Sequence, residues 1–229
     1  MERVLVGLAG ATGYVGQELV SLLARHPRVT LTTAMSSGAG RTSLPRMARV
    51  WDGELVPLSV DQLAEKTNAV FLALPDPVTA EVVPALVERG VRVFDLSGTF
   101  RLRNSEQRAK WYPSASDAVA NTAVYGLPEH CGDALRNATL VACPGCYPTA
   151  ALLALRPLIA ADLLADDLVI DAKSGLSGAG KTPSERTHFS ECHGNVASYG
   201  IFSHRHAAEI EQELQKTVTF VPHLVPLDR

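Results

Sequence analysis

Hydrophobic residues over the first 145 positions alternate between short apolar runs and amphipathic segments. The runs RVLVGLA at 3–9, VTLTTAM at 29–35 and NAVFLAL at 68–74 are typical of buried parallel strands. Further strands are predicted at 91–97 and 138–143, and helices at 14–26, 60–66 and 77–89. This β–α alternation predicts a Rossmann-type, doubly wound parallel sheet with helices on both faces.

The remaining residues follow a looser pattern. A helix is predicted at 146–161, followed by the strand LVIDAKSG, the loop GLSGAGK, the helix HAAEIEQELQK and a final strand VTFVPHLVPL. Residues 38–57 lack a clean period, and we expect an excursion from the sheet there. We therefore expect an α/β protein with a Rossmann-type first domain over 1–145 and an α+β second domain over 146–229.

Composition narrows the class of protein. With 229 residues, 46% of them hydrophobic and 20% charged, the chain can bury a substantial core. A net charge of −3 gives no general attraction to nucleic acid or to an anionic membrane, and no apolar run approaches the roughly 18–20 residues of a membrane span. Four scattered cysteines are too few for a disulfide framework, so we expect a cytoplasmic protein.

The stretch GLAGATGYVGQ has glycines at 10, 13 and 16, where the first strand gives way to a helix. Such glycines allow a sharp turn, close approach of the backbone to a pyrophosphate, and tight packing of helix on strand. The helix N-terminus then offers N–H groups to the phosphates. Glycines also serve plain turns, but the flanking strands and helix favour dinucleotide binding.

The end of the second strand indicates which dinucleotide is bound. An NAD site usually offers Asp or Glu about 20 residues beyond the last loop glycine, whereas this chain reads AMSSGAGR. Ser36, Ser37 and Arg41 could donate to a 2′-phosphate, which favours NADP(H). The alternative is that Arg41 is a solvated loop residue.

The motif CPGCYPTAALLAL places Cys146 at the first turn of a helix, behind Pro144 and Gly145. N–H dipoles at that position favour thiolate over thiol and so predict a nucleophile. A redox pair with Cys143 and a structural or metal role are the alternatives. No second close Cys/His pair supports zinc, and we expect no metal site.

Two histidines, His204 and His206, precede the last helix with Arg205 between them. A lone histidine is usually structural, but this grouping predicts an acid–base and anion site. The loop SGLSGAGK offers backbone N–H groups and serines to a ligand, or is an exposed turn.

Six motifs together resemble the N-acetyl-γ-glutamyl-phosphate reductase family of arginine biosynthesis, which is related to aspartate-semialdehyde dehydrogenase. They are GATGYVGQEL, DLSGTFRL, YGLPE, PGCYPTAALLAL, DAKSGLSGAGK and HRHAAEIEQEL. The resemblance implies a homo-oligomer, a dimer or tetramer, that reduces an acyl phosphate with NADPH and releases inorganic phosphate. It also implies that residues 1–145 form the NADP-binding domain and that residues 146–229 form an α+β catalytic and dimerisation domain. Relative to the family, the chain departs at Cys143, where Asn is common, and stops before further strands of the second domain, which we expect to be incomplete.

The resemblance also implies roles for single residues. Cys146 would attack the acyl phosphate, and His204 would be the acid–base residue when the thioester is reduced, with His206 as the less favoured alternative for that role. The implied cofactor residues are Gly10, Thr12, Gly13, Tyr14, Val15, Gly16, Ser36, Ser37, Arg41, Ser174 and Gly175. The implied substrate residues are Ser97, Arg101, Ser177 and His206. Aspartate-semialdehyde dehydrogenase, a non-enzymatic NADP-binding regulator and a thiol–disulfide oxidoreductase are the alternative functions.

Overall fold

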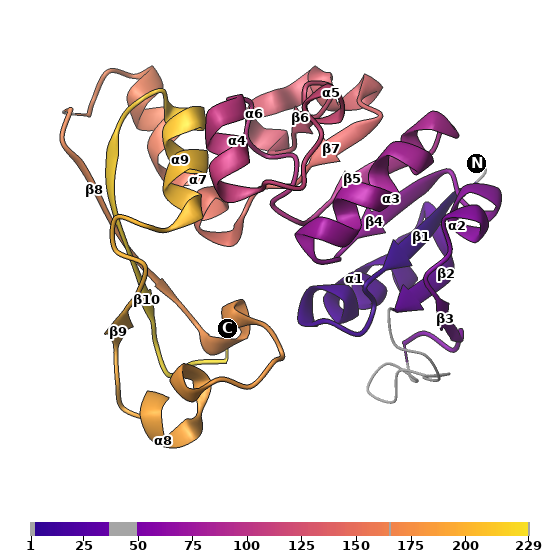
Figure 1. The fold of residues 1–229 in the computed structure, drawn as a ribbon, viewed down its shortest axis with the longest axis horizontal. Coiled ribbons are helices and arrows are strands. Elements are labelled where there is room, and N and C mark those ends of the chain that lie inside the picture. The colour runs from indigo at the N-terminus through magenta and orange to yellow at the C-terminus, as the bar shows by residue number, and fades with distance from the viewer. Residues whose placement is uncertain (1–2, 37–49, 165, 229) are drawn as a thin grey trace. The chain divides into compact units, whose positions relative to one another are not determined.

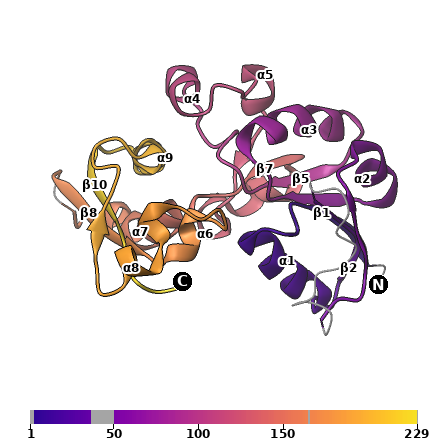
Figure 2. The same ribbon diagram turned by 60° about the horizontal axis from the view of Figure 1, so that its bottom comes forward.

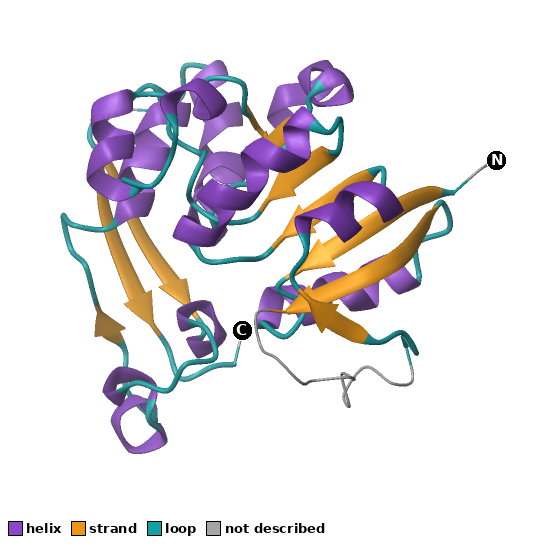
Figure 3. Ribbon diagram, turned by 45° about the vertical axis from the view of Figure 1, so that its right-hand side comes forward, coloured by secondary structure: helices purple, strands orange, loops and turns teal. Residues whose placement is uncertain are grey.

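The computed structural model describes residues 3–36, 50–164 and 166–228, which fall into two compact units, Met1–Pro144 and Gly145–Arg229 (Figure 1). The first unit is built on a seven-stranded sheet in the order β3-β2-β1-β4-β5-β7-β6. Every recorded pairing in it is parallel, and its strands run side by side in Figure 3. The strands are β1 (Val4–Ala9), β2 (Val29–Ser36), β3 (Leu55–Pro57), β4 (Ala69–Leu72), β5 (Arg92–Asp95), β6 (Val124–Tyr125) and β7 (Leu140–Ala142).

Helices cover both faces of this sheet (Figure 2). They are α1 (Tyr14–Ala24), α2 (Val60–Lys66), α3 (Asp76–Glu88), α4 (Ser105–Trp111), α5 (Asp117–Ala120) and α6 (Pro128–Cys131), followed by the 3₁₀ turn η2 (Gly132–Asn137). On one face, Val20 of α1 packs with Leu8 and Ala34 of the strands. On the other, Leu63 and Leu86 of α2 and α3 join the larger core cluster. The predicted doubly wound sheet is therefore confirmed.

The strand order reverses between β1 and β4. The chain leaves β1 to build β2 and β3 on one side, and returns to place β4, β5, β7 and β6 on the other. In doubly wound sheets, ligands bind outside the carboxyl ends of the strands at such a switch point. The glycine loop that follows β1 lies at this position.

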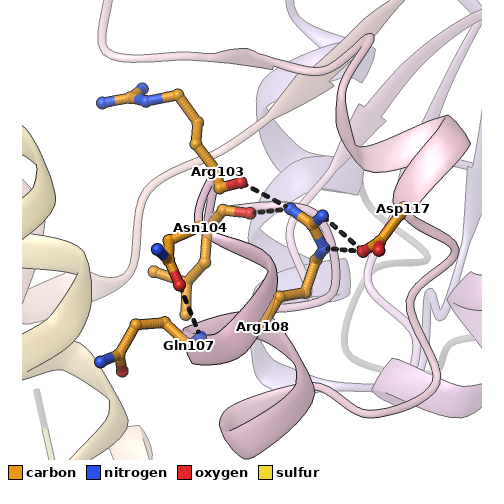
Figure 4. Close-up of polar contacts among 6 residues, drawn as sticks. Arg103, Asn104, Gln107, Arg108 and Asp117 are labelled. Carbon is orange, nitrogen blue, oxygen red and sulfur yellow. Dashed lines mark hydrogen bonds and ion pairs between the residues drawn. The ribbon is translucent and has the colours of Figure 1, made fainter.

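A buried arginine organises the polar segment that follows β5 (Figure 4). Arg108 of α4 is only 2% exposed, and its Nη1 donates to the carbonyl oxygens of Leu102 at 2.6 Å and Arg103 at 3.1 Å. Its Nε donates to Asp117 at 3.0 Å. At the start of the helix, the Asn104 side chain accepts the Gln107 N–H. Charge-assisted bonds thus hold a segment that has no apolar period of its own.

The second unit has a three-stranded mixed sheet in the order β8-β10-β9. β10 pairs with β8 in parallel and with β9 in antiparallel orientation. Its elements are α7 (Cys146–Ala160), β8 (Leu168–Ser174), the turns η3 (Leu176–Ala179) and η4 (Glu185–Thr187), α8 (Phe189–Cys192), β9 (Ala197–Ser198), α9 (Arg205–Leu214) and β10 (Val218–Leu224). Helices α7 and α9 pack together, and α9 also packs on β10. This arrangement confirms the predicted α+β class of the second part. None of the helices in the described residues is long and apolar enough to cross a membrane.

Candidate active site

The glycine loop of the first unit is packed too tightly for larger residues at two positions. Gly10 has φ +88°, and a Cβ there would meet the Ala73 carbonyl oxygen at 2.1 Å. A Cβ on Gly16 would meet the Gly10 carbonyl oxygen at the same distance. The Gly10 and Ala11 N–H groups both donate to Met35 O, at 2.9 and 3.0 Å. These contacts fix the loop against the end of β2.

Gly13 differs from these two glycines because the loop leaves space for a Cβ at this position. A Cβ there would lie 3.5 Å from Gly10 O, an ordinary contact, and φ is −69°. As the N-cap of α1, Gly13 brings no side chain to the N–H groups of the first turn. The next two residues, Tyr14 and Val15, are 41% and 50% exposed. The loop and helix start therefore fit a dinucleotide pyrophosphate.

Of the residues predicted to select NADP, only Ser36 can be placed. It ends β2, is 4% exposed, and pairs with Pro57 of β3. Ser37 and Arg41 lie outside the described residues. The choice between NADP and NAD therefore stays a prediction from the sequence.

Ser97 and Arg101, predicted at the substrate, make internal contacts within the first unit. The Ser97 N–H and hydroxyl donate to Asp95 at 2.8 and 2.9 Å. Arg101 is 6% exposed, and it donates from Nε to Cys143 O at 2.7 Å and from Nη2 to Leu96 O at 2.8 Å. These contacts brace the ends of β5 and β7. Burial raises the pKa of Asp95 to about 6, although the bonds from Ser97 oppose it.

The two cysteines of the CPGC motif lie in different environments. Cys146 is exposed and is the first residue of α7, with Gly145 as its N-cap. Gly145 has φ −65° and ψ 162° and contributes no side-chain cap. Burial raises the pKa of Cys143 to about 12, so this thiol stays protonated near neutral pH. Cys146 is therefore the more accessible nucleophile.

A cavity of about 760 Å³ lies wholly within the second unit and brings several predicted residues together. Cys146, Ser174, His204 and His206 all line it. Among the residues that the structure describes, Gly175 and Ser177 belong to the adjoining segment but not to the lining, and the Ser177 N–H donates to Asp228 O. A thiol, two imidazoles and a hydroxyl thus face one space. Within the described residues, no group of three His, Cys, Asp or Glu side chains could hold a metal ion.

His204 is the N-cap of α9, and its Nδ1 accepts the His206 N–H at 3.1 Å. Burial, with a contribution from Arg205, lowers the pKa of His204 and favours a neutral ring. Because Nδ1 is an acceptor, the proton of the neutral ring resides on Nε2. The His206 ring lies edge-on to His204, with their centroids 4.7 Å apart, and is 8% exposed.

Comparison with known proteins extends over nearly the whole chain. Residues 5–138 match the family model described as the NAD binding domain of semialdehyde dehydrogenase, and residues 146–229 match its dimerisation domain. N-acetyl-gamma-glutamyl-phosphate reductase from Brevibacillus brevis is 45% identical over 240 residues, covering 99% of this chain and 69% of the relative. The enzyme of that name from Synechocystis is 42% identical, covering 100% of this chain and 69% of the relative.

The chain belongs to the N-acetyl-gamma-glutamyl-phosphate reductase family. The resemblance inferred from its motifs is therefore confirmed, and the chain is an oxidoreductase with a nicotinamide-dinucleotide-binding domain and a dimerisation domain. Among solved structures, aspartate semialdehyde dehydrogenase II from Vibrio cholerae has a TM-score of 0.72 at 18% identity, covering 99% of this chain and 71% of that one. This likeness supports the fold alone.

Three side chains that line this cavity, Tyr147, Tyr199 and Arg186, were not predicted from the sequence. The Tyr199 hydroxyl donates to the Tyr147 hydroxyl at 3.2 Å, and Tyr147 donates to His223 O at 2.9 Å. Burial raises the pKa of both phenols, so they stay protonated. The Arg186 guanidinium lies 5.5 Å from the Tyr199 ring centroid. Tyr147 directly follows Cys146 and Tyr199 shortly precedes His204 in the sequence, whereas Arg186 comes from a segment for which the sequence indicated no role.

Proposed function

We propose that this protein catalyses the NADPH-dependent reduction of N-acetyl-γ-glutamyl phosphate to N-acetylglutamate 5-semialdehyde and inorganic phosphate, in arginine biosynthesis in the cytoplasm. The identity of its relatives as N-acetyl-gamma-glutamyl-phosphate reductases supports the substrate. The observation that carries the proposal is the cavity in which an exposed Cys146, at the start of α7, shares a lining with His204 and His206. Residues 1–145 would hold the cofactor, and 146–229 would supply the chemistry and the contacts of a homodimer or tetramer.

The reaction begins at the sulfur of Cys146. The thiolate attacks the γ-carbonyl carbon, the C–O bond to phosphate breaks, and phosphate leaves with the bonding electrons, so that a thioester remains. The cofactor, when bound, would supply the hydride that reduces this carbonyl carbon. The resulting thiohemiacetal releases the aldehyde when its C–S bond breaks and the electron pair returns to sulfur.

In this proposal the two histidines have different roles, one in stabilising charge and the other in proton transfer. With Nδ1 occupied by the His206 N–H, neutral His204 presents Nε2–H as a hydrogen-bond donor, suited to the substrate carbonyl oxygen. His206 then accepts the thiol proton and later returns it. The motif-based prediction gave the acid–base role to His204. The bond at Nδ1 favours His206 for proton transfer and His204 for charge stabilisation.

The first unit would bind the cofactor through the backbone of its glycine loop. Gly10 and Gly16 leave no space for a Cβ, whereas Gly13 leaves the first turn of α1 open. Thr12, Tyr14 and Val15 complete the proposed cofactor residues of this loop, with Ser36 at the end of β2. Proposed roles for Ser174 and Gly175 at the cofactor, and for Ser177 at the substrate, rest on the family motif.

The reverse reaction of the purified full-length protein tests this function. N-acetylglutamate semialdehyde, phosphate and NADP⁺ should give NADPH, and omission of phosphate should stop it. Aspartate semialdehyde should react at least ~100-fold more slowly in kcat/KM, because the cavity would have to distinguish an acetylated from a free amino group. A preference for aspartate semialdehyde would favour the dehydrogenase of that name. NADP binding with no turnover of either compound would favour a regulator.

A further inference from the structure

Glu209 is a fully buried carboxylate next to the proposed site. It belongs to α9, three residues after His206, and has no exposed surface. Its Oε1 accepts the Gly145 N–H at 2.8 Å. Placing a carboxylate in an apolar interior costs several kcal/mol unless hydrogen bonds or charges compensate. A charge-assisted bond from a backbone N–H is such a compensation, and it fixes the donor as well as the acceptor.

This bond joins the two segments that carry the proposed chemistry. Gly145 is the N-cap of α7 and immediately precedes Cys146. Glu209 follows the two histidines on α9, and α7 packs against α9. One contact between residues 64 apart in sequence therefore relates the turn that presents the thiol to the helix that presents the imidazoles. A glycine has more backbone freedom than other residues, so its conformation depends on such restraints.

We propose that Glu209 is a positioning residue for the reaction. By holding the Gly145 N–H, its carboxylate oxygen keeps the Cys146 sulfur in reach of the histidine pair. The inference rests on the proposed function, in which that sulfur passes its proton to His206. Misplacement of a reacting group by about 1 Å can cost ~100-fold in rate, which is the size of effect expected when this restraint is lost.

Three substitutions separate the position of the acceptor oxygen from its charge. Glu209→Gln keeps an acceptor oxygen at the same reach and removes the charge. Glu209→Asp keeps the charge and withdraws the oxygen by one methylene. Glu209→Ala removes both. Glu211→Gln is the matched control, because Glu211 lies on the same helix and accepts a backbone N–H too, from Val218 at 3.1 Å, where α9 leads into β10.

The expected result is a split between kcat and KM. Glu209→Ala and Glu209→Asp should lower kcat by ~100-fold with KM within ~3-fold of wild type, whereas Glu209→Gln should stay within ~10-fold in kcat. Glu211→Gln should leave kcat unchanged. The proposal is overturned if Asp restores activity and Gln does not, or if kcat in the Glu209 variants matches the control. If Glu209→Ala does not fold, the comparison of kcat between Glu209→Gln and Glu209→Asp still tests the proposal.

A second readout needs no substrate and so separates this inference from the proposed function. The rate of Cys146 alkylation by iodoacetamide reports the contact of the sulfur with its proton acceptor. We expect Glu209→Asp and His206→Asn to slow it by at least ~10-fold, and Glu209→Gln to change it little. Wild-type alkylation rates in Glu209→Asp would contradict positioning. If the alkylation contrast holds but no semialdehyde is turned over, the proposed function fails and the positioning role remains.

Discussion

His204 Nδ1 accepts the backbone N–H of His206 at 3.1 Å, so one imidazole both lines the cavity and caps the helix that carries the other. An N-cap side chain contributes about 1 kcal/mol to helix stability. Loss of activity after removal of His204 could therefore arise from fraying of α9 and not from chemistry. Any test of its role has to preserve the cap.

His204→Asn preserves the cap, because Asn is among the best N-cap residues. We expect this variant to unfold at nearly the wild-type temperature, whereas His204→Ala should lose about 1 kcal/mol. If His204 donates through Nε2–H to the substrate oxygen, kcat in His204→Asn should fall by ~100-fold, the usual effect of losing one such donor, and the shape of the pH–rate profile should stay unchanged.

His206→Asn should behave differently from His204→Asn. If His206 accepts the thiol proton, its loss should lower kcat by ~10²–10⁴-fold and remove one limb of the pH–rate profile. Steady-state rates over the pH range in which histidine titrates check both variants. Loss of that limb in His204→Asn, with its retention in His206→Asn, would restore the acid–base role to His204.

Cys146→Ser should abolish turnover and leave the dissociation constant for NADPH nearly unchanged, because the glycine loop proposed to bind the pyrophosphate lies in the other unit. Cys143→Ser should keep turnover within ~10-fold, since a thiol with a pKa of about 12 does not form a thiolate at neutral pH. Steady-state rates and fluorescence titration with NADPH measure these effects. Equal damage from the two substitutions would instead favour a redox pair.

Local pattern predicted most of the first unit. The predicted strand at 3–9 and helix at 14–26 appear as Val4–Ala9 and Tyr14–Ala24, because apolar periodicity and glycine spacing act over a few residues. In this unit β3 and β6, of three and two residues, were missed, as was β9 of two residues in the second unit, because such strands are too short to show a period. The polar segment around Arg108 was expected to be only partly helical and its helix bounds were not predicted, because the buried hydrogen bonds of Arg108 that help to hold it leave no periodic signal.

Residues of the candidate site were predicted only where they belong to a short local sequence motif. Cys146 follows a proline and a glycine at a helix start, and the histidines precede a helix, so their spacing was readable. The contact of Glu209 with Gly145 crosses 64 residues, and in the sequence Glu209 is one of several glutamates on an amphipathic helix. Burial distinguishes it from its neighbours, and burial of one side of a helix depends on what packs there.

Two glycines of the loop after β1 should respond to substitution in opposite ways. Gly16→Ala should destabilise the first unit by ~1–3 kcal/mol, because its Cβ would lie 2.1 Å from Gly10 O. Gly13→Ala should cost under ~1 kcal/mol, since its Cβ meets only an ordinary contact at 3.5 Å. Gly13→Ala should also weaken NADPH binding by at least ~10-fold, because the pyrophosphate is proposed to approach the backbone at this position. Thermal unfolding and cofactor titration measure the two effects, and wild-type affinity in Gly13→Ala would place the pyrophosphate elsewhere.

Asp95 should make the stability of the first unit depend on pH. Burial raises the pKa of Asp95 from 3.8 to about 6. Between these two pH values, Asp95 is protonated in the folded state and ionised in the unfolded chain. The free energy of unfolding should therefore fall as pH rises through this window, by on the order of 3 kcal/mol from this group. Asp95→Asn should remove this contribution, because a neutral amide does not titrate.

Urea unfolding followed by tryptophan fluorescence measures this dependence. Both tryptophans, Trp51 and Trp111, lie in the first unit, so the signal reports that unit. Other carboxylates titrate in both proteins and cancel in the difference between wild type and Asp95→Asn. Between about pH 4 and about pH 7, the wild type should become less stable relative to Asp95→Asn. Only the wild type has to bury an ionised carboxylate at the higher pH. A constant difference over this range would mean that Asp95 is ionised in the folded state throughout, with the bonds from Ser97 and the nearby Arg101 outweighing the cost of burial.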